Sequence, residues 1–265
     1  MQENQLSEVV EKILSSKTLI FDYDGVLAPI NVARSKSMVF DEITEPLKLL
    51  SRKFKLVVAS TKDYSFLINR VDFAHILICS NGFEVRIGVL PTIPKMPSNE
   101  KLQLFYQLIA EAKELAESHG MDVEVKKIVV EPLNIPVGLC IDWRRSTLSR
   151  DDAVRLIEPV INAAEKGGLN VVRYPEQPFI DIFIDKIDKG WAIKALLSIN
   201  AISRPITYFG DSENDIPAFK VSDINVLIRH EENRNLTING TYELTRREFF
   251  NLINMLSGME KNTIY

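Results

Sequence analysis

Two aspartates stand two residues apart where an apolar run of strand type ends. The run Leu19-Ile20-Phe21 leads into Asp22 and Asp24, and Gly25 follows at once, which permits a tight backbone turn. Carboxylates at the end of a buried strand cost free energy unless something requires them there. A bound cation together with a phosphoryl group would require them, so the pair is predicted to carry chemistry.

Three later segments share this character, because each is polar and either ends or follows an apolar stretch. They are Ser60-Thr61-Lys62, Asp188-Lys189-Gly190 and Gly210-Asp211-Ser212-Glu213-Asn214-Asp215. Several carboxylates in one place repel one another unless a divalent cation neutralises them. Oxygen ligands together with water and phosphate suit Mg²⁺, and a lysine and a hydroxyl group can then hold the remaining phosphate oxygens.

This set of groups is sufficient for phosphoryl transfer. A carboxylate in such a site can act as the nucleophile and form an aspartyl-phosphate. A second carboxylate two residues further on can protonate the leaving oxygen and later activate a water molecule.

Alternating strands and helices are expected to position these segments. Apolar strands are predicted at 17–22, 55–59, 75–79, 206–210 and 224–228, and helices at 4–15, 41–52, 64–69, 189–199, 214–220 and 246–257. The alternation predicts a parallel sheet covered on both faces. Ligands of such sheets bind at the carboxyl ends of the strands, where three of the four segments would meet. Lys189 would point inward from the first turn of its helix.

The pattern changes in the middle of the chain. Helices are predicted at 99–118 and 150–166, and strands at 122–130, 137–143, 169–173 and 179–184. Two neighbouring strands without a helix between them fit an antiparallel sheet, so this stretch is predicted to be an α+β insert. The fold class is therefore α/β, with a core at 1–85 and 188–265 that is interrupted by a second domain at 86–187.

The four segments, in this order, resemble the motifs of the haloacid dehalogenase superfamily, on its phosphatase branch. Phe21-Asp22-Tyr23-Asp24-Gly25-Val26-Leu27 is similar to the first motif, which implies Asp22 as nucleophile and Asp24 as general acid and base. The resemblance also implies a Rossmann-like, doubly wound core, and the insert's position between the second and third motifs is that of the larger cap of this superfamily.

The resemblance implies roles for further residues. Ser60 matches the hydroxyl that binds phosphate, with Thr61 as a competitor for that role, and Lys189 matches the lysine that neutralises phosphate and nucleophile. Asp211 would be a metal ligand, Asp215 a supporting acidic residue of the same metal site, and Asn214 a residue that binds the substrate or its phosphate. Asp22 and the main-chain carbonyl of Asp24 would complete the Mg²⁺ site.

Substrate specificity is expected to come from the insert. Arg144 and Arg145 follow an apolar strand there, and an arginine fork suits an anionic or hydroxyl-rich ligand, although ordinary strand-end charge explains them equally well. Lys126 and Asp181 are expected on solvated faces, and Lys62 is left open as a solvated residue. The three histidines, among them His230, show no ligand spacing, so surface or packing roles are expected for them.

Composition limits the class of partner. The chain has 265 residues, 46% hydrophobic content and a net charge of −4 without a basic block, which argues against nucleic acid as the main partner. The polar N-terminus does not resemble a secretory signal, and no apolar run is long enough to cross a membrane. Cys79 and Cys140 are expected to be reduced thiols, which predicts a cytoplasmic location. A monomer or a small homo-oligomer is expected.

The predicted function is Mg²⁺-dependent hydrolysis of a sugar phosphate. Leu27-Ala28-Pro29-Ile30 is similar to trehalose-6-phosphate phosphatases, whereas Ser60-Thr61-Lys62 and Ser80-Asn81-Gly82 are similar to mannosyl-3-phosphoglycerate phosphatases. A mannosyl- or glucosyl-3-phosphoglycerate phosphatase is thus an alternative, and so is a phosphosugar mutase, since phosphomannomutases carry the same motifs. From another class, the alternatives are a receiver-type phosphorylatable domain and a non-catalytic sugar-phosphate sensor.

Overall fold

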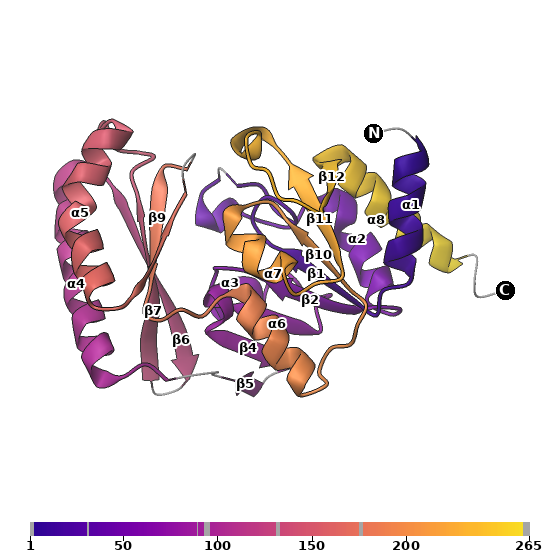
Figure 1. The fold of residues 1–265 in the computed structure, drawn as a ribbon, viewed down its shortest axis with the longest axis horizontal. Helices are drawn as coiled ribbons and strands as arrows, with labels where there is room; N and C mark the ends of the chain where they lie inside the picture. The colour runs from indigo at the N-terminus through magenta and orange to yellow at the C-terminus, as the bar shows by residue number, and fades with distance from the viewer. Residues whose placement is uncertain are drawn as a thin grey trace.

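The computed structural model contains two β-sheets with separate helical layers (Figure 1). It describes residues 3–30, 32–88, 90–92, 96–130, 133–174 and 177–261. The larger sheet has eight strands in the order β12-β11-β10-β1-β2-β3-β4-β5. Their bounds are Thr18–Asp22 (β1), Lys55–Ala59 (β2), Ile76–Cys79 (β3), Glu84–Ile87 (β4), Leu90–Thr92 (β5), Ile206–Gly210 (β10), Ile224–Arg229 (β11) and Tyr242–Thr245 (β12).

The strands from β12 to β3 are all parallel, as the alternating pattern predicts. Asp22 at the end of β1 pairs with Ala59 at the end of β2, and Phe21 pairs with Phe209 of β10. The carboxyl ends of the three central strands are therefore level with one another. Strands β4, β5 and β12 were not predicted; β4 pairs with β3 and the edge strand β5 pairs with β4, both in antiparallel fashion.

Helices cover both faces of this sheet, which makes it doubly wound. Leu19 and Phe21 of β1 pack toward one helical layer, and Ile20 packs toward the other. The first layer consists of Glu3–Leu14 (α1), Asp41–Leu50 (α2), Tyr64–Leu67 (α3) and Arg246–Lys261 (α8), and the second of Lys189–Ser198 (α6) and Ile216–Phe219 (α7). The alternation of apolar side chains along a fully buried strand explains why both layers have an extensive core.

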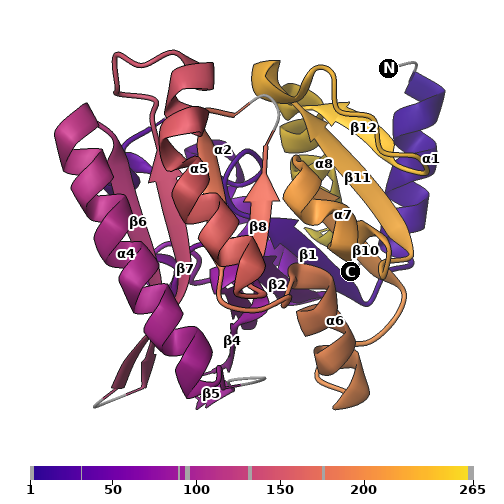
Figure 2. The same cartoon turned by 60° about the vertical axis from the view of Figure 1, so that its left-hand side comes forward.

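The smaller sheet has four antiparallel strands in the order β6-β7-β9-β8. Their bounds are Asp122–Val130 (β6), Leu133–Asp142 (β7), Asn170–Arg173 (β8) and Phe179–Phe183 (β9). Two helices, Asn99–His119 (α4) and Arg150–Lys166 (α5), lie side by side over its outer face, and its other face is turned toward the larger sheet (Figures 1 and 2). This sheet and its helices correspond to the predicted α+β insert.

The larger sheet extends further along the chain than the predicted insert boundary at residue 86. β4 continues to Ile87, and β5 at Leu90–Thr92 pairs with it in the same sheet. The division of the chain at 86 and 187 remains a prediction. Both cysteines are free thiols, as expected, and in the parts of the chain described above no helix is long and apolar enough to cross a membrane.

Candidate active site

The turn after β1 directs Asp22 and Asp24 toward one cleft. Gly25 has a φ of +83°, a left-handed value that glycine adopts without steric cost, and its amide donates to the carbonyl of Ala28 at 2.8 Å. The chain thus reverses immediately after the two acids. Asp22 is buried, whereas the Asp24 carboxylate is partly open and lies 3.6 Å from the Nζ of Lys62.

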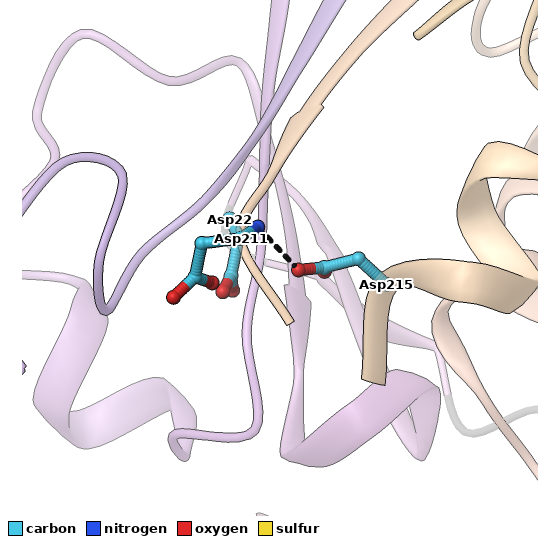
Figure 3. A group of neighbouring side chains, drawn as sticks. All are labelled: Asp22, Asp211 and Asp215. Atoms are coloured by element: carbon cyan, nitrogen blue, oxygen red, sulfur yellow. Dashed lines mark hydrogen bonds between the residues drawn. The ribbon is translucent and has the colours of Figure 1, made fainter. Parts of the chain in front are cut away.

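Three buried carboxylates converge beneath the cleft (Figure 3). Asp22, Asp211 and Asp215 offer oxygen atoms that all lie within 4.8 Å of one another. Asp22 comes from β1, Asp211 follows β10, and Asp215 comes from the short helix Glu213–Asp215 (η3). Parallel strands with level ends therefore bring together residues that are almost 190 positions apart in the sequence, as the sequence predicts for the end of this sheet.

Lys189 links two of these acids from below. Its Nζ donates to Oδ1 of Asp22 at 2.8 Å and to Oδ1 of Asp215 at 2.7 Å, and the side chain is fully buried. The lysine is at the first position of α6, which Asp188 caps by accepting from the amide of Trp191. Burial alone would lower the pKa of Lys189, but Asp215 and Asp22 raise it above its usual value, so the amine is charged.

Asp215 has little remaining capacity to bind a metal directly. Its Oδ1 also accepts from the hydroxyl of Tyr208 at 2.6 Å, and its Oδ2 accepts from the amides of Asp211 at 2.9 Å and Ser212 at 3.1 Å. The bond to the Asp211 amide is drawn in Figure 3. Asp215 therefore fixes Lys189 and the loop that carries Asp211, which agrees with the supporting role implied by the sequence.

The carboxylates of Asp22 and Asp211 accept fewer hydrogen bonds than that of Asp215, so their charges are less fully balanced. Burial raises the pKa of Asp22; Lys189 opposes this, and the charges of Asp215 and Asp211 add to it. Burial and then Asp215 likewise raise the pKa of Asp211. Two adjacent buried carboxylates, of which only Asp22 bonds to the ammonium group of Lys189, fit a small hard cation with oxygen ligands, because such an ion would remove their mutual repulsion. The Asp24 side chain lies outside this three-acid group.

The two candidate hydroxyl groups differ in exposure. Ser60 is 1% exposed, and its Oγ accepts from the amide of Lys62 at 3.1 Å. Thr61 lines the cleft directly, as does Asn214. The main chain of Ser60 is held on both sides, since its amide donates to Ile78 and its carbonyl accepts from Asn81. Ser60 thus helps to shape the loop, while Thr61 faces the space that a phosphate group would occupy.

The cleft has a volume of about 520 Å³ and lies between the ends of the larger sheet and the inner face of the smaller one. Both predicted arginines line it. Arg144 is paired with Asp142, at 3.6 Å, and Arg145 is paired with Asp122, at 3.5 Å, and remains mostly exposed. The structure therefore brings the arginines to the same cleft as Asp22 and Asp24, at its far wall.

Two expectations of solvated residues were wrong. Lys126 and Asp181 are both buried, with 2.6 Å between Nζ and Oδ1, and Tyr174 donates to the other oxygen of Asp181 at 3.0 Å. All three line the cleft. Asp181 alternates with apolar residues as in a solvent-facing strand, but β9 is an inner strand of its sheet, so its polar face looks into the cleft.

Lys62, for which a solvated position was left open, lines the cleft. Its Nζ lies 3.6 Å from Asp24 and 3.9 Å from Glu124 of β6. Glu124 also pairs with Arg34, whose other nitrogen lies 2.5 Å from Asp63. Neither Arg34 nor Glu124 was singled out from the sequence, since each stands in a stretch without a motif, and only the approach of the two sheets joins them.

His230 also departs from the expected surface or packing role. Its Nε2 lies 2.8 Å from Oδ2 of Asp211, and its Nδ1 lies 2.9 Å from Glu232. The histidine follows β11, which is the parallel neighbour of β10, so it ends beside the residue that follows β10. No sequence spacing could have indicated this contact, because it depends on the order of the strands.

The chain is similar to known proteins in part of its sequence and in its fold. The sequence model of the haloacid dehalogenase-like hydrolases matches residues 155–235. No curated protein matches the sequence of the chain at a significant level. The C-terminal domain of a trehalose-6-phosphate phosphatase from C. albicans has a similar structure, with a TM-score of 0.78 at 16% identity over 97% of each chain.

Two other solved structures are similar over almost their whole length. A trehalose-6-phosphate phosphatase related protein has a TM-score of 0.70 at 15% identity, covering 93% of this chain and 99% of its own. The sugar phosphatase BT4131, of haloacid dehalogenase subclass IIB, has a TM-score of 0.58 at 14% identity, covering 94% and 100%. The expected fold class and the resemblance to haloacid dehalogenase-like hydrolases are confirmed, and the family model supports an enzyme of this class.

Proposed function

We propose that this chain is a Mg²⁺-dependent phosphomonoesterase that hydrolyses a sugar phosphate through an aspartyl-phosphate on Asp22. The observation that carries the proposal is the buried group of Asp22, Asp211 and Lys189 at the base of a cleft that also contains Asp24. A nucleophile, a cation site, a fixed positive charge and a proton donor are thus all next to one space. The small sheet with α4 and α5 would act as the cap over it.

The metal ion would be held by Asp22, Asp211 and the main-chain carbonyl of Asp24. When bound, it would neutralise the charge of the carboxylates and of the phosphate oxygens. Asp215 would take no direct part, since its oxygens already accept hydrogen bonds from Lys189, Tyr208 and two backbone amides. Its task would be to hold Lys189 and Asp211 in place.

The residues of the chain then divide the reaction between them. A carboxylate oxygen of Asp22 attacks phosphorus while the bond from phosphorus to the sugar oxygen breaks, and protonated Asp24 gives its proton to that oxygen. Asp24 next accepts a proton from water as the water oxygen bonds to phosphorus and the bond to Asp22 breaks. Lys189 and Thr61 stabilise negative charge on the phosphate oxygens throughout.

The charges on the rest of the cleft favour a neutral, hydroxyl-rich leaving group. Beyond Asp22 and Asp211, its lining holds five carboxylates and five cations, namely Asp24, Asp122, Glu124, Asp142 and Asp181 with Arg34, Lys62, Lys126, Arg144 and Arg145. Interspersed acceptors and donors suit sugar hydroxyls, whereas a carboxylate on the leaving group would find no excess of positive charge. This favours a substrate like trehalose 6-phosphate over a glycosyl-3-phosphoglycerate, and two structural neighbours are named for trehalose-6-phosphate phosphatase.

The test is a phosphate-release panel with Mg²⁺ and with EDTA. It should contain trehalose 6-phosphate, sucrose 6-phosphate, hexose phosphates, mannosyl- and glucosyl-3-phosphoglycerate and an aryl phosphate. We expect Mg²⁺-dependent release with a preference for a neutral sugar phosphate. Turnover of the aryl phosphate alone would remove the support for a sugar substrate, and an isomerised sugar phosphate as product would identify a mutase instead.

A matched pair of variants tests the nucleophile. Asp22→Asn should reduce phosphate release by at least about 1,000-fold, since the amide is a poor nucleophile and covalent catalysis is lost. Asp72→Asn is the control, because Asp72 is a surface residue with a side chain 68% exposed. Undiminished Mg²⁺-dependent turnover by Asp22→Asn would exclude the proposed mechanism.

A further inference from the structure

The imidazole of His230 is held between two carboxylates. Nε2 lies 2.8 Å from Oδ2 of Asp211 and Nδ1 lies 2.9 Å from Oε2 of Glu232, while the side chain is only 6% exposed. Each ring nitrogen faces a carboxylate oxygen, and an N–H on either nitrogen donates to the carboxylate beside it, so these contacts set the orientation of the ring. Through its contact with Oδ2, the ring can in turn restrain the carboxylate of Asp211.

The same turn also holds the main chain of Asp211. The side-chain amide of Asn233 donates to the carbonyl of Asp211 at 2.7 Å and to that of Ile228 at 2.8 Å, and its oxygen accepts from the amide of His230 at 3.0 Å. Residues 230–233 therefore contact Asp211 at both its backbone and its carboxylate. The contact exists because β11 runs parallel to β10 and ends beside it.

His230 reaches Asp211 from the side that faces away from the cleft. Asp211 lines both the main cleft and a second cavity of about 200 Å³, and His230 and Glu232 line the second cavity. Neither His230 nor Glu232 is among the residues that line the main cleft. Any effect of His230 on the reaction would therefore pass through Asp211 and not through direct contact with the substrate.

Asp211 needs such a restraint because it lies in a crowded group of acids. Its carboxylate is buried beside those of Asp22 and Asp215, with oxygen atoms of all three within 4.8 Å of one another, and like charges at this distance repel. A hydrogen-bonding group on the outer side of a ligand keeps its carboxylate in the binding orientation. Removal of such groups in metalloenzymes costs about 10–100-fold in metal affinity or activity.

We propose that His230, oriented by Glu232, is a positioning residue that holds Asp211 in the orientation that binds the metal ion. The inference rests on the proposed function, since it takes Asp211 as a metal ligand. The proposal gives the turn after β11 a role in metal affinity. This turn lies outside the four segments that resemble the superfamily motifs.

The experiment measures Mg²⁺ binding by titration calorimetry in the absence of substrate. His230→Ala should raise the Kd for Mg²⁺ by about 10–100-fold. His230→Gln should recover part of this loss, because its terminal amide can still donate to Asp211, and Glu232→Gln should give a smaller increase. His119→Ala is the control, since His119 is exposed on α4 and its ring bonds the carbonyl of Leu115 in the same helix.

Kinetics and unfolding separate the positioning role from a general structural one. The Mg²⁺ concentration that gives half-maximal phosphate release should rise in His230→Ala, while kcat at saturating Mg²⁺ stays within a few-fold of the wild-type value. A lowered unfolding temperature with an unchanged Kd for Mg²⁺ would overturn the inference, as would a loss of kcat that saturating Mg²⁺ does not restore. If His230→Ala does not fold, His230→Gln and Glu232→Gln give the same comparison.

The outcomes also separate this inference from the proposed function. A wild-type protein that binds no Mg²⁺ would contradict both. A wild-type protein that binds Mg²⁺ and requires it for turnover, together with His230 and Glu232 variants of unchanged affinity, would contradict the inference alone.

Discussion

Gly25 leaves the space that the carboxylate of Asp211 occupies. An ideal Cβ on Gly25 would lie 2.6 Å from the Cγ of Asp211 and closer still to its Oδ2. The turn that follows the nucleophile and the loop that carries the candidate metal ligand are therefore packed directly against each other. Gly25 therefore does more than permit the turn after Asp24. Because it has no side chain, it also leaves the space that allows Asp22 and Asp211 to come together.

Gly25→Ala should displace Asp211 and weaken Mg²⁺ binding. The added Cβ would overlap the carboxylate of Asp211 and not the main chain, so the loss should appear mainly in metal affinity and turnover, by at least about 10-fold. Gly240→Ala is the matched control: Gly240 has a φ of +77°, close to that of Gly25, but an added Cβ would have no atom within 4 Å. Equal effects of the two substitutions on Mg²⁺ affinity, measured by calorimetry, would show that backbone strain and not the Asp211 contact is responsible.

The sequence predicts which residues meet at the carboxyl end of the larger sheet, because each of them directly follows a strand. Asp22, Ser60 and Asp211 follow apolar runs whose length and order determine where they meet, and this needs no knowledge of side-chain packing. Thr61 and Asn214 lie in the cleft for the same reason.

The predicted environments were wrong for residues that come together because of the order of the strands, or across an intervening strand. His230 reaches Asp211 only because β11 lies next to β10. Lys126 of β6 reaches Asp181 of β9 across the intervening strand β7. Gly138 of β7 leaves room for it, because a Cβ placed on Gly138 would lie 3.0 Å from the Cδ of Lys126. A pattern of alternating residues shows which side chains share a face but not whether that face is covered or which strand lies beside it.

Lys189→Met should destabilise the protein when no metal is bound. The substitution leaves Asp22 and Asp215 buried without their shared ammonium group, and removal of one partner of a buried ion pair costs about 3–5 kcal/mol. Phosphate release should also fall by at least about 100-fold, since a fixed positive charge at the phosphate is lost. Lys194→Met, at an exposed position of the same helix, is the control for both urea unfolding and turnover. A free energy of unfolding equal to that of Lys194→Met would contradict the role of the lysine as the link between the acids.

The Lys126–Asp181 pair should show strong non-additivity in unfolding. Lys126→Met alone leaves the buried Asp181 unpaired, for which we expect a cost of about 3–5 kcal/mol, whereas the double variant Lys126→Met with Asp181→Leu should recover most of that stability. Urea unfolding of the four proteins of the cycle measures the coupling. Additive losses would mean that the pair is already solvated.

The same pair gives a pH dependence in the alkaline range. Burial opposes the charge of Lys126, but Asp181 raises its pKa above the usual value. The stabilisation is therefore complete below about pH 10.4, the usual value for lysine, and is lost as the pH rises toward the folded-state pKa. We expect the wild-type unfolding free energy to fall more steeply above pH 10 than that of the double variant. Burial and then Asp181 also raise the pKa of Tyr174, so the titration of this hydroxyl adds to the same difference between the two proteins.

Glu124→Gln should weaken the contact between the two sheets at the mouth of the cleft. Glu124 is the carboxylate on β6 that pairs with Arg34 and lies 3.9 Å from Lys62, both of which belong to the larger-sheet part of the chain. The glutamine keeps the shape and removes the charge, so closure over the substrate should be less favourable and kcat/KM for the sugar phosphate should fall by about 10-fold. Because these side chains are partly exposed, salt screens their attraction, and the wild-type kcat/KM should decline toward that of the variant as the NaCl concentration rises. Glu165→Gln is the control, since Glu165 pairs with Arg173 at 2.7 Å within the small-sheet part and spans no cleft. If the two variants lose the same fraction of activity and keep the same salt dependence, the ion pairs of Glu124 have no part in closing the site.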